Sequence, residues 1–298
     1  MIGRLSSAQL HQGSLDVILD AQARLQRTQE ELASGKRILT PSDDPVAAGQ
    51  IQTIRSELAR IETLQKNANH AYNDLAMAES VLDGVQDALQ RARDLTVRGG
   101  NDALSVSEKQ LIANEIDGIR DQILALANSK SAQNEYIFAG YATNEPAFLL
   151  NDQTVSYQGD SGVREVNIST SVTVKTRIPG SEIFGDETDG VFASLEALAT
   201  SLRSDDRGSF TAAFQALDSA ITDVSDARST LGVRMNQVSE QQSLNEAFNI
   251  QLNDSLGNLE DLDYARVISE MNLQMVALEA AQKAYTNTQS LSLFNYMT

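Results

Sequence analysis

Residues 32–49 constrain the fold of this chain more than any other segment, because they hold two of its four prolines. The segment reads L-A-S-G-K-R-I-L-T-P-S-D-D-P-V-A-A-G. Its first glycine suits the left-handed conformation at a helix C-terminus, and its two aspartates offer N-cap carboxylates before a proline at the first helical position. We therefore predict an elbow that ends one helix and starts another. The elbow residues are Gly35, Pro41, Asp43, Asp44 and Pro45.

Most of the chain after the elbow has helical spacing of its apolar residues. Residues 46–97 contain no proline and predict one long helix or two nearly collinear helices. A Gly-Gly-Asn sequence ends this pattern, and Ser105 with Glu108 has the spacing of a capping box that opens a helix over about residues 106–130. Helical spacing resumes near Gly190. Two helices joined by a short loop predict an antiparallel helical hairpin.

The middle of the chain has a different pattern. Between Tyr136 and Phe184 the helical spacing gives way to β-branched alternations, T-V-S-Y near Val155 and V-N-I-S-T-S-V-T-V from Val166 to Val174. Such short alternating runs, separated by Gly, Asp and Ser, are typical of strands. We predict a small antiparallel β domain inserted into a helical domain.

These patterns together predict a mainly α fold, a long helical coiled-coil rod built from both chain ends with the small β domain in the middle. Residues 1–40 and 260–298 are predicted to form a terminal coiled-coil assembly domain. Residues 41–138 and 188–259 would form a helical rod domain, and residues 139–187 the inserted β domain.

The two chain ends carry narrow apolar stripes that match each other. Near the C-terminus the apolar positions step by four and three, which is the spacing of a coiled-coil seam. A narrow stripe covers one side of a helix only, so the apolar residues outside the seam predict association with further copies of the chain or with its relatives. The predicted assembly seam consists of Leu15, Ile18, Leu25, Leu32, Tyr264, Ile268, Met271, Met275, Leu278 and Tyr285.

Composition and motifs argue against several other classes of protein. The formal net charge of −18 disfavours nucleic acid and anionic membranes as partners, and the lack of cysteine excludes disulfides and thiolate metal sites. We find no cleavable signal, no apolar run long enough to insert into a membrane, and no catalytic or cofactor motif. The run G-D-E-T-D-G from Gly185 lacks the closing glutamate of a calcium loop. We therefore expect no enzyme activity, no cofactor and no metal.

The motifs at both chain ends resemble those of the bacterial flagellin superfamily, over nearly the whole chain. The elbow string is similar to the family's junction between its first two helices, and its D-D-P-V favours the subunits that join hook to filament over flagellin, which more usually carries D-D-A-A-G. The string L-E-D-L-D-Y-A-R-V-I-S-E-M resembles the acidic D-x-D-x-A start of the family's last helix. Asp261, Asp263 and Ala265 fill that pattern. Y-I-F-A-G and V-S-Y-Q-G-D resemble the start of the junction subunits' middle domain.

This resemblance implies a mechanical role without catalysis, in which the chain adapts the ring of hook-associated proteins to the filament. The implied partners are copies of itself in a ring, the first hook-associated protein on the hook side and flagellin on the filament side. It also implies an extracellular place in the flagellum, reached by flagellar type III export, with a cytosolic export chaperone on the C-terminal helix. Two alternatives stay open at this point. One is a flagellin filament subunit, and the other is a secreted or regulatory coiled-coil module.

Overall fold

The computed structural model describes the backbone of residues 7–151 and 154–297, and the side chains of residues 12–151 and 154–287. It divides the chain into two compact units. The end unit comprises Met1–Arg60 and Asn249–Thr298, and the middle unit comprises Ile61–Phe248.

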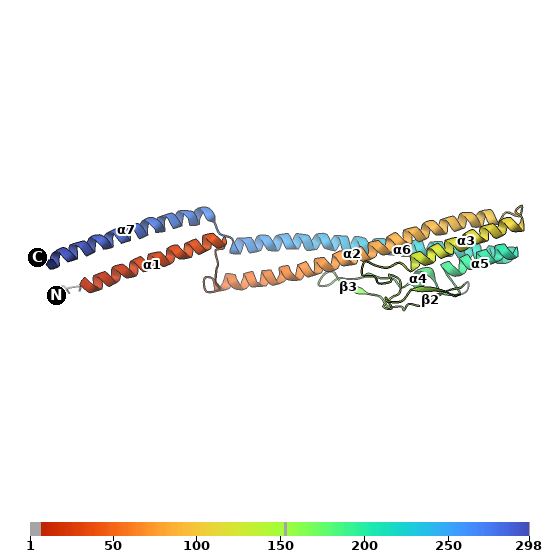
Figure 1. The fold of residues 1–298 in the computed structure, drawn as a ribbon, viewed down its shortest axis with the longest axis horizontal. Coiled ribbons are helices and arrows are strands. Elements are labelled where there is room, and N and C mark those ends of the chain that lie inside the picture. Colours follow the sequence, from red (N-terminus) through yellow and green to blue (C-terminus); the bar gives the residue numbers. More distant parts are fainter. Residues whose placement is uncertain (1–6, 152–153, 298) are drawn as a thin grey trace. The chain divides into compact units, whose positions relative to one another are not determined.

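The end unit contains two helices from opposite ends of the sequence, α1 (Ser7–Ser34) and α7 (Tyr264–Met297), which pack along each other (Figure 1). It also contains the beginning of α2 (Pro45–Gly99) and the end of α6 (Arg207–Glu260). A small apolar cluster lies beside the elbow and joins Ile38, Ala47 and Ile51 to Leu256 and Leu259.

The border of the end unit differs from the predicted one. The sequence suggests borders at residues 40 and 260, where the helices are interrupted, whereas the structure divides the chain at residues 60 and 249. The reason is that Ile38 of the elbow shares a cluster with the first turns of α2 and the last turns of α6. The elbow therefore belongs with the two helix ends against which it packs.

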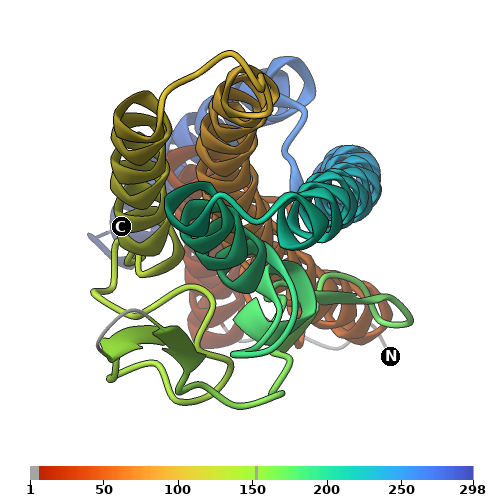
Figure 2. The ribbon, with the colours of Figure 1, turned by 90° about the vertical axis from the view of Figure 1, so that its right-hand side faces the viewer.

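The middle unit is a helical bundle built from the rest of α2 and α6 with α3 (Val106–Ala127) and α5 (Val191–Ser204). Figure 2 shows these helices nearly end-on, with the strands on one side of the bundle. The predicted long helix is the single helix α2, and α3 starts with the predicted capping box, in which Ser105 and Glu108 bond each other's backbone N–H groups. From Ala68 onward, buried positions of α2 recur every three or four residues: Ala68, Ala71, Leu75, Ala78, Leu82, Val85, Leu89 and Ala92.

The predicted β region forms two separate antiparallel hairpins. β1 (Phe148–Asn151) pairs with β2 (Thr154–Tyr157), and β3 (Glu165–Asn167) pairs with β4 (Thr173–Lys175). The alternating run from Val166 is thus two strands joined by a turn, and β1 and the short helix α4 (Gly180–Phe184) were not predicted.

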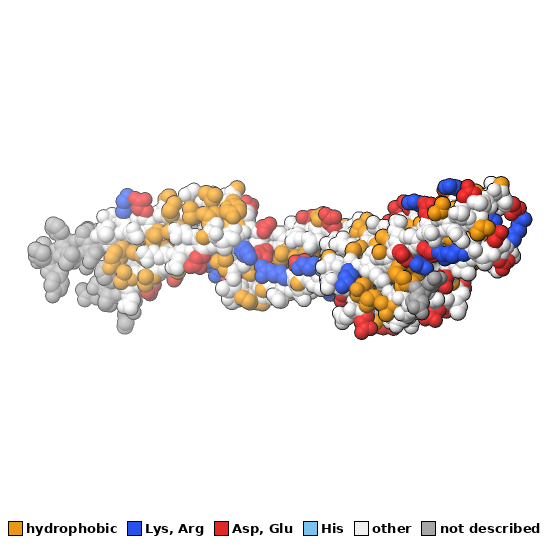
Figure 3. Space-filling view, turned by 45° about the vertical axis from the view of Figure 1, so that its right-hand side comes forward, with side chains coloured by type: hydrophobic (Ala, Val, Ile, Leu, Met, Phe, Trp, Pro, Cys, Tyr) orange, Lys and Arg blue, Asp and Glu red, His pale blue; other side chains and the backbone are white. Residues whose placement is uncertain are grey.

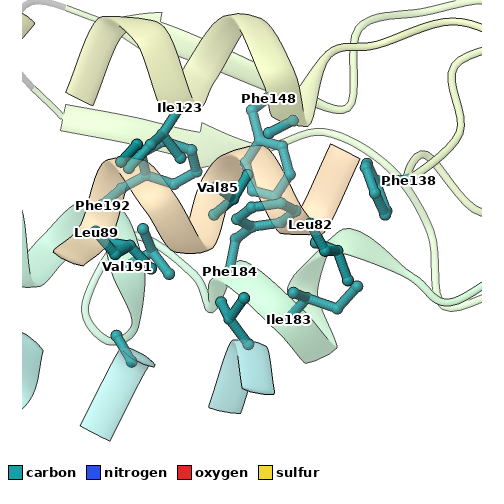
Figure 4. Packing of buried hydrophobic residues seen from close by; sticks show 14 of the residues in the cluster. Leu82, Val85, Leu89, Ile123, Phe138, Phe148, Ile183, Phe184, Val191 and Phe192 are labelled. Atoms are coloured by element: carbon teal, nitrogen blue, oxygen red, sulfur yellow. The ribbon is translucent and has the colours of Figure 1, made fainter. Parts of the chain in front are cut away.

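In the described residues of the hairpins there is no separate core, because their buried side chains belong to the core of the helices. Phe148 and Phe184 lie against Phe192 of α5, with ring centroids 5.2 and 5.9 Å from it, and Phe138 lies 5.4 Å from Phe184 (Figure 4). A two-stranded hairpin alone is at best marginally stable in water. The inserted segment is therefore a layer on the helical bundle.

Candidate functional site: the elbow and the terminal helices

The elbow begins with a glycine whose conformation other residues rarely adopt. Gly35 follows the last residue of α1, has φ of +69°, and donates its N–H to the carbonyl of Glu31 at 2.9 Å. A Cβ atom at this position would lie 2.6 Å from the hydroxyl of Tyr264 at the start of α7. The glycine thus ends α1 and lets α7 start close beside it.

Replacing Gly35 by alanine is expected to destabilise the end unit by about 1–2 kcal/mol, because a side chain disfavours the left-handed conformation. The matched control is Gly49→Ala in α2, where a Cβ would meet nothing within 4 Å and alanine favours the helix. Thermal unfolding followed by circular dichroism compares the two. A loss as large at Gly49 as at Gly35 would contradict this explanation.

The two elbow aspartates have different roles. Asp44 caps α2, since its Oδ1 accepts the N–H of Ala47 at 3.0 Å and Pro45 follows as the first helical residue. Asp43 instead holds the loop, because its Oδ2 accepts the N–H groups of Leu39 and Thr40 at 3.1 and 2.9 Å. Of the two predicted N-cap carboxylates, only that of Asp44 bonds the first turn of α2. Pro41 is exposed.

The carboxylate of Asp43 is also paired with Arg27 of α1, whose Nη2 lies 2.5 Å from Oδ1. The backbone N–H of Thr40 and the hydrogen bond from Arg27 lower the pKa of Asp43 to about 2. Asp43 therefore ties the last turns of α1 to the loop that leads to α2.

Asp43 should make the end unit sensitive to acid in a defined range. Because its pKa falls from an ordinary 3.8 to about 2 on folding, Asp43 stabilises the folded state above pH 3.8 and loses this contribution as pH falls towards 2. Asp43→Asn should thus be less stable than the parent at pH 7, with the difference vanishing between pH 3.8 and about 2. Thermal unfolding over this pH range measures it.

A second variant, Arg27→Met, tests how much of this pH dependence comes from the ion pair between Arg27 and Asp43. It keeps the hydrogen bond from Thr40, which lowers the pKa of Asp43 most, so it should retain much of the pH dependence. If Arg27→Met removed the pH dependence as completely as Asp43→Asn, the ion pair would be its main cause.

The elbow and the start of α7 are joined by a short backbone bridge, which we call the clasp and define as residues 35–37 and 260–262. The N–H of Leu262 donates to the carbonyl of Gly35 at 3.1 Å, and the N–H of Arg37 donates to the carbonyl of Glu260 at 2.8 Å. Lys36 and Asp261 face each other in this antiparallel bridge. The chain therefore passes from α1 to α2 and from α6 to α7 at one place.

A buried carboxylate lies in the clasp. The side chain of Glu260 is 7% exposed, accepts bonds from Arg55 Nη2 at 2.8 and 2.7 Å, and is paired with Lys36. Burial alone would raise the pKa of Glu260, but the hydrogen bonds from Lys36 and Arg55 outweigh it and lower the pKa. Sequence reasoning missed this cluster, because Glu260 lies more than 200 residues along the chain from both Lys36 and Arg55.

The acidic motif before α7 is divided between the clasp and the helix cap. Asp263 caps α7, since its Oδ1 accepts the N–H of Arg266 at 3.1 Å. Asp261 lies in the clasp with an exposed side chain, and Ala265 is exposed in the first turn of α7. The motif thus marks the turn from α6 into α7.

The predicted assembly seam is divided between two faces of the terminal helices. In α7 the buried or half-buried positions step by four and three, and they differ in part from the predicted ones: Val267, Met271, Gln274, Leu278, Ala281 and Tyr285. In α1, Ile18, Leu25 and Leu32 are half-buried, and the hydroxyl of Thr28 lies 3.1 Å from Oε1 of Gln274 across the helix pair. The remaining seam residues are exposed: Leu15, Tyr264, Ile268 and Met275.

The terminal helices therefore keep an uncovered apolar surface even when they pair. It includes Ile268 and Met275 together with Leu273 and Val276, which are all exposed on α7. Figure 3 shows hydrophobic side chains gathered on this helix. No helix in the described part of the chain is long and apolar enough to cross a membrane.

Two family models match the parts of the chain that hold the paired terminal helices and the elbow. The model of the bacterial flagellin N-terminal helical region matches residues 6–143, and that of the C-terminal helical region matches residues 214–297. The chain belongs to the bacterial flagellin family.

Within this family the chain is similar to hook-associated protein 3 over nearly its whole length. It is 29% identical to flagellar hook-associated protein 3 of Salmonella typhimurium and to that of Escherichia coli, over 98% of either chain. Flagellin of Bacillus subtilis is 25% identical over 86% of each chain. Among solved structures, Bacillus cereus FlgL is 26% identical with a TM-score of 0.59 and covers 69% of this chain and 99% of its own. The flagellar junction protein FlgL of Legionella pneumophila has the same fold, with a TM-score of 0.60 at 18% identity, covering 71% of this chain and 99% of its own.

Proposed function

We propose that this chain is a structural subunit of the bacterial flagellum that joins the hook to the filament. The observation that carries the proposal is its similarity to flagellar hook-associated protein 3 over 98% of both chains. Similarity to flagellin is lower and covers less of either chain, so the filament subunit is the second candidate. Family membership and motifs at both ends disfavour an unrelated secreted or regulatory coiled coil.

In this role the terminal helices would make the contacts between subunits. The exposed apolar side chains of α7 support self-association in a ring, because a surface of this kind is normally covered in an assembly. The first hook-associated protein would lie on the hook side and flagellin on the filament side. We further propose that the chain leaves the cell unfolded through the flagellar type III system, with an export chaperone on its C-terminal helix.

Deletion of the gene tests the proposed place in the flagellum. A junction subunit leaves hooks without filaments and flagellin in the culture medium, since export continues but the filament has no base. Electron microscopy and an assay for flagellin in the medium measure both. Hooks without shed flagellin would indicate the filament subunit instead, and normal filaments would reject both candidates. Restoring the gene is the control.

The self-association surface is tested separately with Ile268→Glu/Met275→Glu, which places charge on the exposed face of α7. The substituted protein should keep its helical circular dichroism and its export but fail to support filaments. The matched control is Asn272→Glu, at an exposed polar position of the same helix. Normal filaments with Ile268→Glu/Met275→Glu would show that this face is free in the assembly.

A further inference from the structure

Glu260 joins three segments that the sequence keeps apart. It is the last residue of α6, its carboxylate binds Lys36 of the elbow and Arg55 of α2, and its backbone carbonyl accepts the N–H of Arg37. The guanidinium of Arg37 adds a bond to the carbonyl of Leu259 at 2.8 Å. Glu260 thus contacts both connecting segments of the end unit. One leads from α1 to α2, and the other leads from α6 to α7.

The pairing of α1 with α7 does not by itself define one alignment. Apart from Thr28 and Gln274, the facing sides are mostly apolar, so moving one helix by a heptad would again place apolar side chains opposite each other at most positions and would lose the Thr28–Gln274 bond. Most of these side chains are only half-buried, which limits the cost of such a shift. The clasp lies directly after Ser34 of α1 and directly before Tyr264 of α7, where it can select one alignment.

We propose that Glu260 is a positioning residue whose charge locks the two connections together and so fixes the alignment of α1 on α7. A carboxylate is suited to this task because it accepts from two cations at once, and because this carboxylate is buried it has few partners other than Lys36 and Arg55. The bond between Thr28 and Gln274 forms in this alignment only, since a heptad shift would remove Gln274 from Thr28. The inference does not depend on which flagellar subunit the chain is.

The lack of cysteine in the chain allows a direct test with a pair of spin labels. Labels are attached through Gln26→Cys and Asn272→Cys, two exposed positions on α1 and α7, and the distance between them is measured by pulsed electron paramagnetic resonance on the full-length chain. We expect one narrow distance in this parent. Adding Glu260→Gln should broaden the distribution or add a second distance, with the population at the parent distance reduced several-fold.

Two further variants distinguish positioning from a general loss of charge or folding. Glu279→Gln removes an equal charge from an exposed ion pair with Lys283 on α7, and it should leave the narrow distance unchanged. Arg55→Gln leaves Lys36 on Glu260 and should broaden the distribution less than Glu260→Gln does. An unchanged narrow distance in Glu260→Gln would overturn the proposal, because the helices would then align through their seam alone. A broad distribution in the parent would overturn it as well.

Discussion

Replacing Phe184 by alanine is expected to lower the free energy of unfolding of the middle unit by about 3–5 kcal/mol, because it removes a fully buried ring from a close-packed core. The ring of Phe184 lies 5.4 Å from that of Phe148 in β1 and 5.9 Å from that of Phe192 in α5. It therefore connects the inserted segment to the helices, as Figure 4 shows for the rings of Phe148, Phe184 and Phe192. We expect its loss to leave a cavity between them.

The matched control for this prediction is Phe248→Ala, the same substitution at a residue of α6 that is 53% exposed. We expect it to cost less than about 1 kcal/mol, since little apolar surface returns to water. Urea unfolding followed by circular dichroism measures both, and hydrogen exchange shows whether the hairpins and the helices lose protection together. Equal costs of the two substitutions, or loss of protection confined to the hairpins, would contradict a shared core.

Replacing Glu135 by alanine is expected to destabilise the middle unit by about 3 kcal/mol, because it leaves a buried guanidinium without its carboxylate. Glu135 pairs with Arg177, whose side chain is 5% exposed, and its carboxylate lies 3.8 Å from Arg164. Glu135 itself is one-third exposed, which places the expected loss at the lower end of the range for buried pairs.

Replacing Arg177 should lower the free energy of unfolding less than replacing Glu135 does. In Arg177→Met the carboxylate of Glu135 keeps access to water and to Arg164, while the methionine fills the apolar part of the site. Urea unfolding of Glu135→Ala, of Arg177→Met and of the double variant forms a cycle, in which the double variant should be more stable than Glu135→Ala alone. If the two single losses simply added, the ion pair would not account for them.

The helices of this protein follow from the sequence, because their signals are local. Ser105 and Glu108 lie three residues apart and form the predicted capping box, and Gly35 ends α1 where a left-handed residue was expected. The family resemblance also rests on local strings at the two chain ends, and the family models match both regions. The strand at Val155 was predicted, while β1 was missed because it is a short strand with no clear alternation, and it pairs only through β2.

The candidate site required the tertiary structure, because its contacts join residues far apart along the chain. The sequence marks Asp43 and Asp44 alike as cap residues. In the folded elbow, Asp44 caps α2, whereas Asp43 pairs with Arg27 of α1. In α7, apolar spacing by itself does not say which stripe faces α1, since neighbouring stripes of that helix are both apolar, and the structure turns Met271 inward and Met275 outward. Glu260 has no sequence signal that distinguishes it from exposed glutamates. Its role comes from Lys36 and Arg55, which folding brings to it, because the energy of a buried charge is set by its neighbours in space.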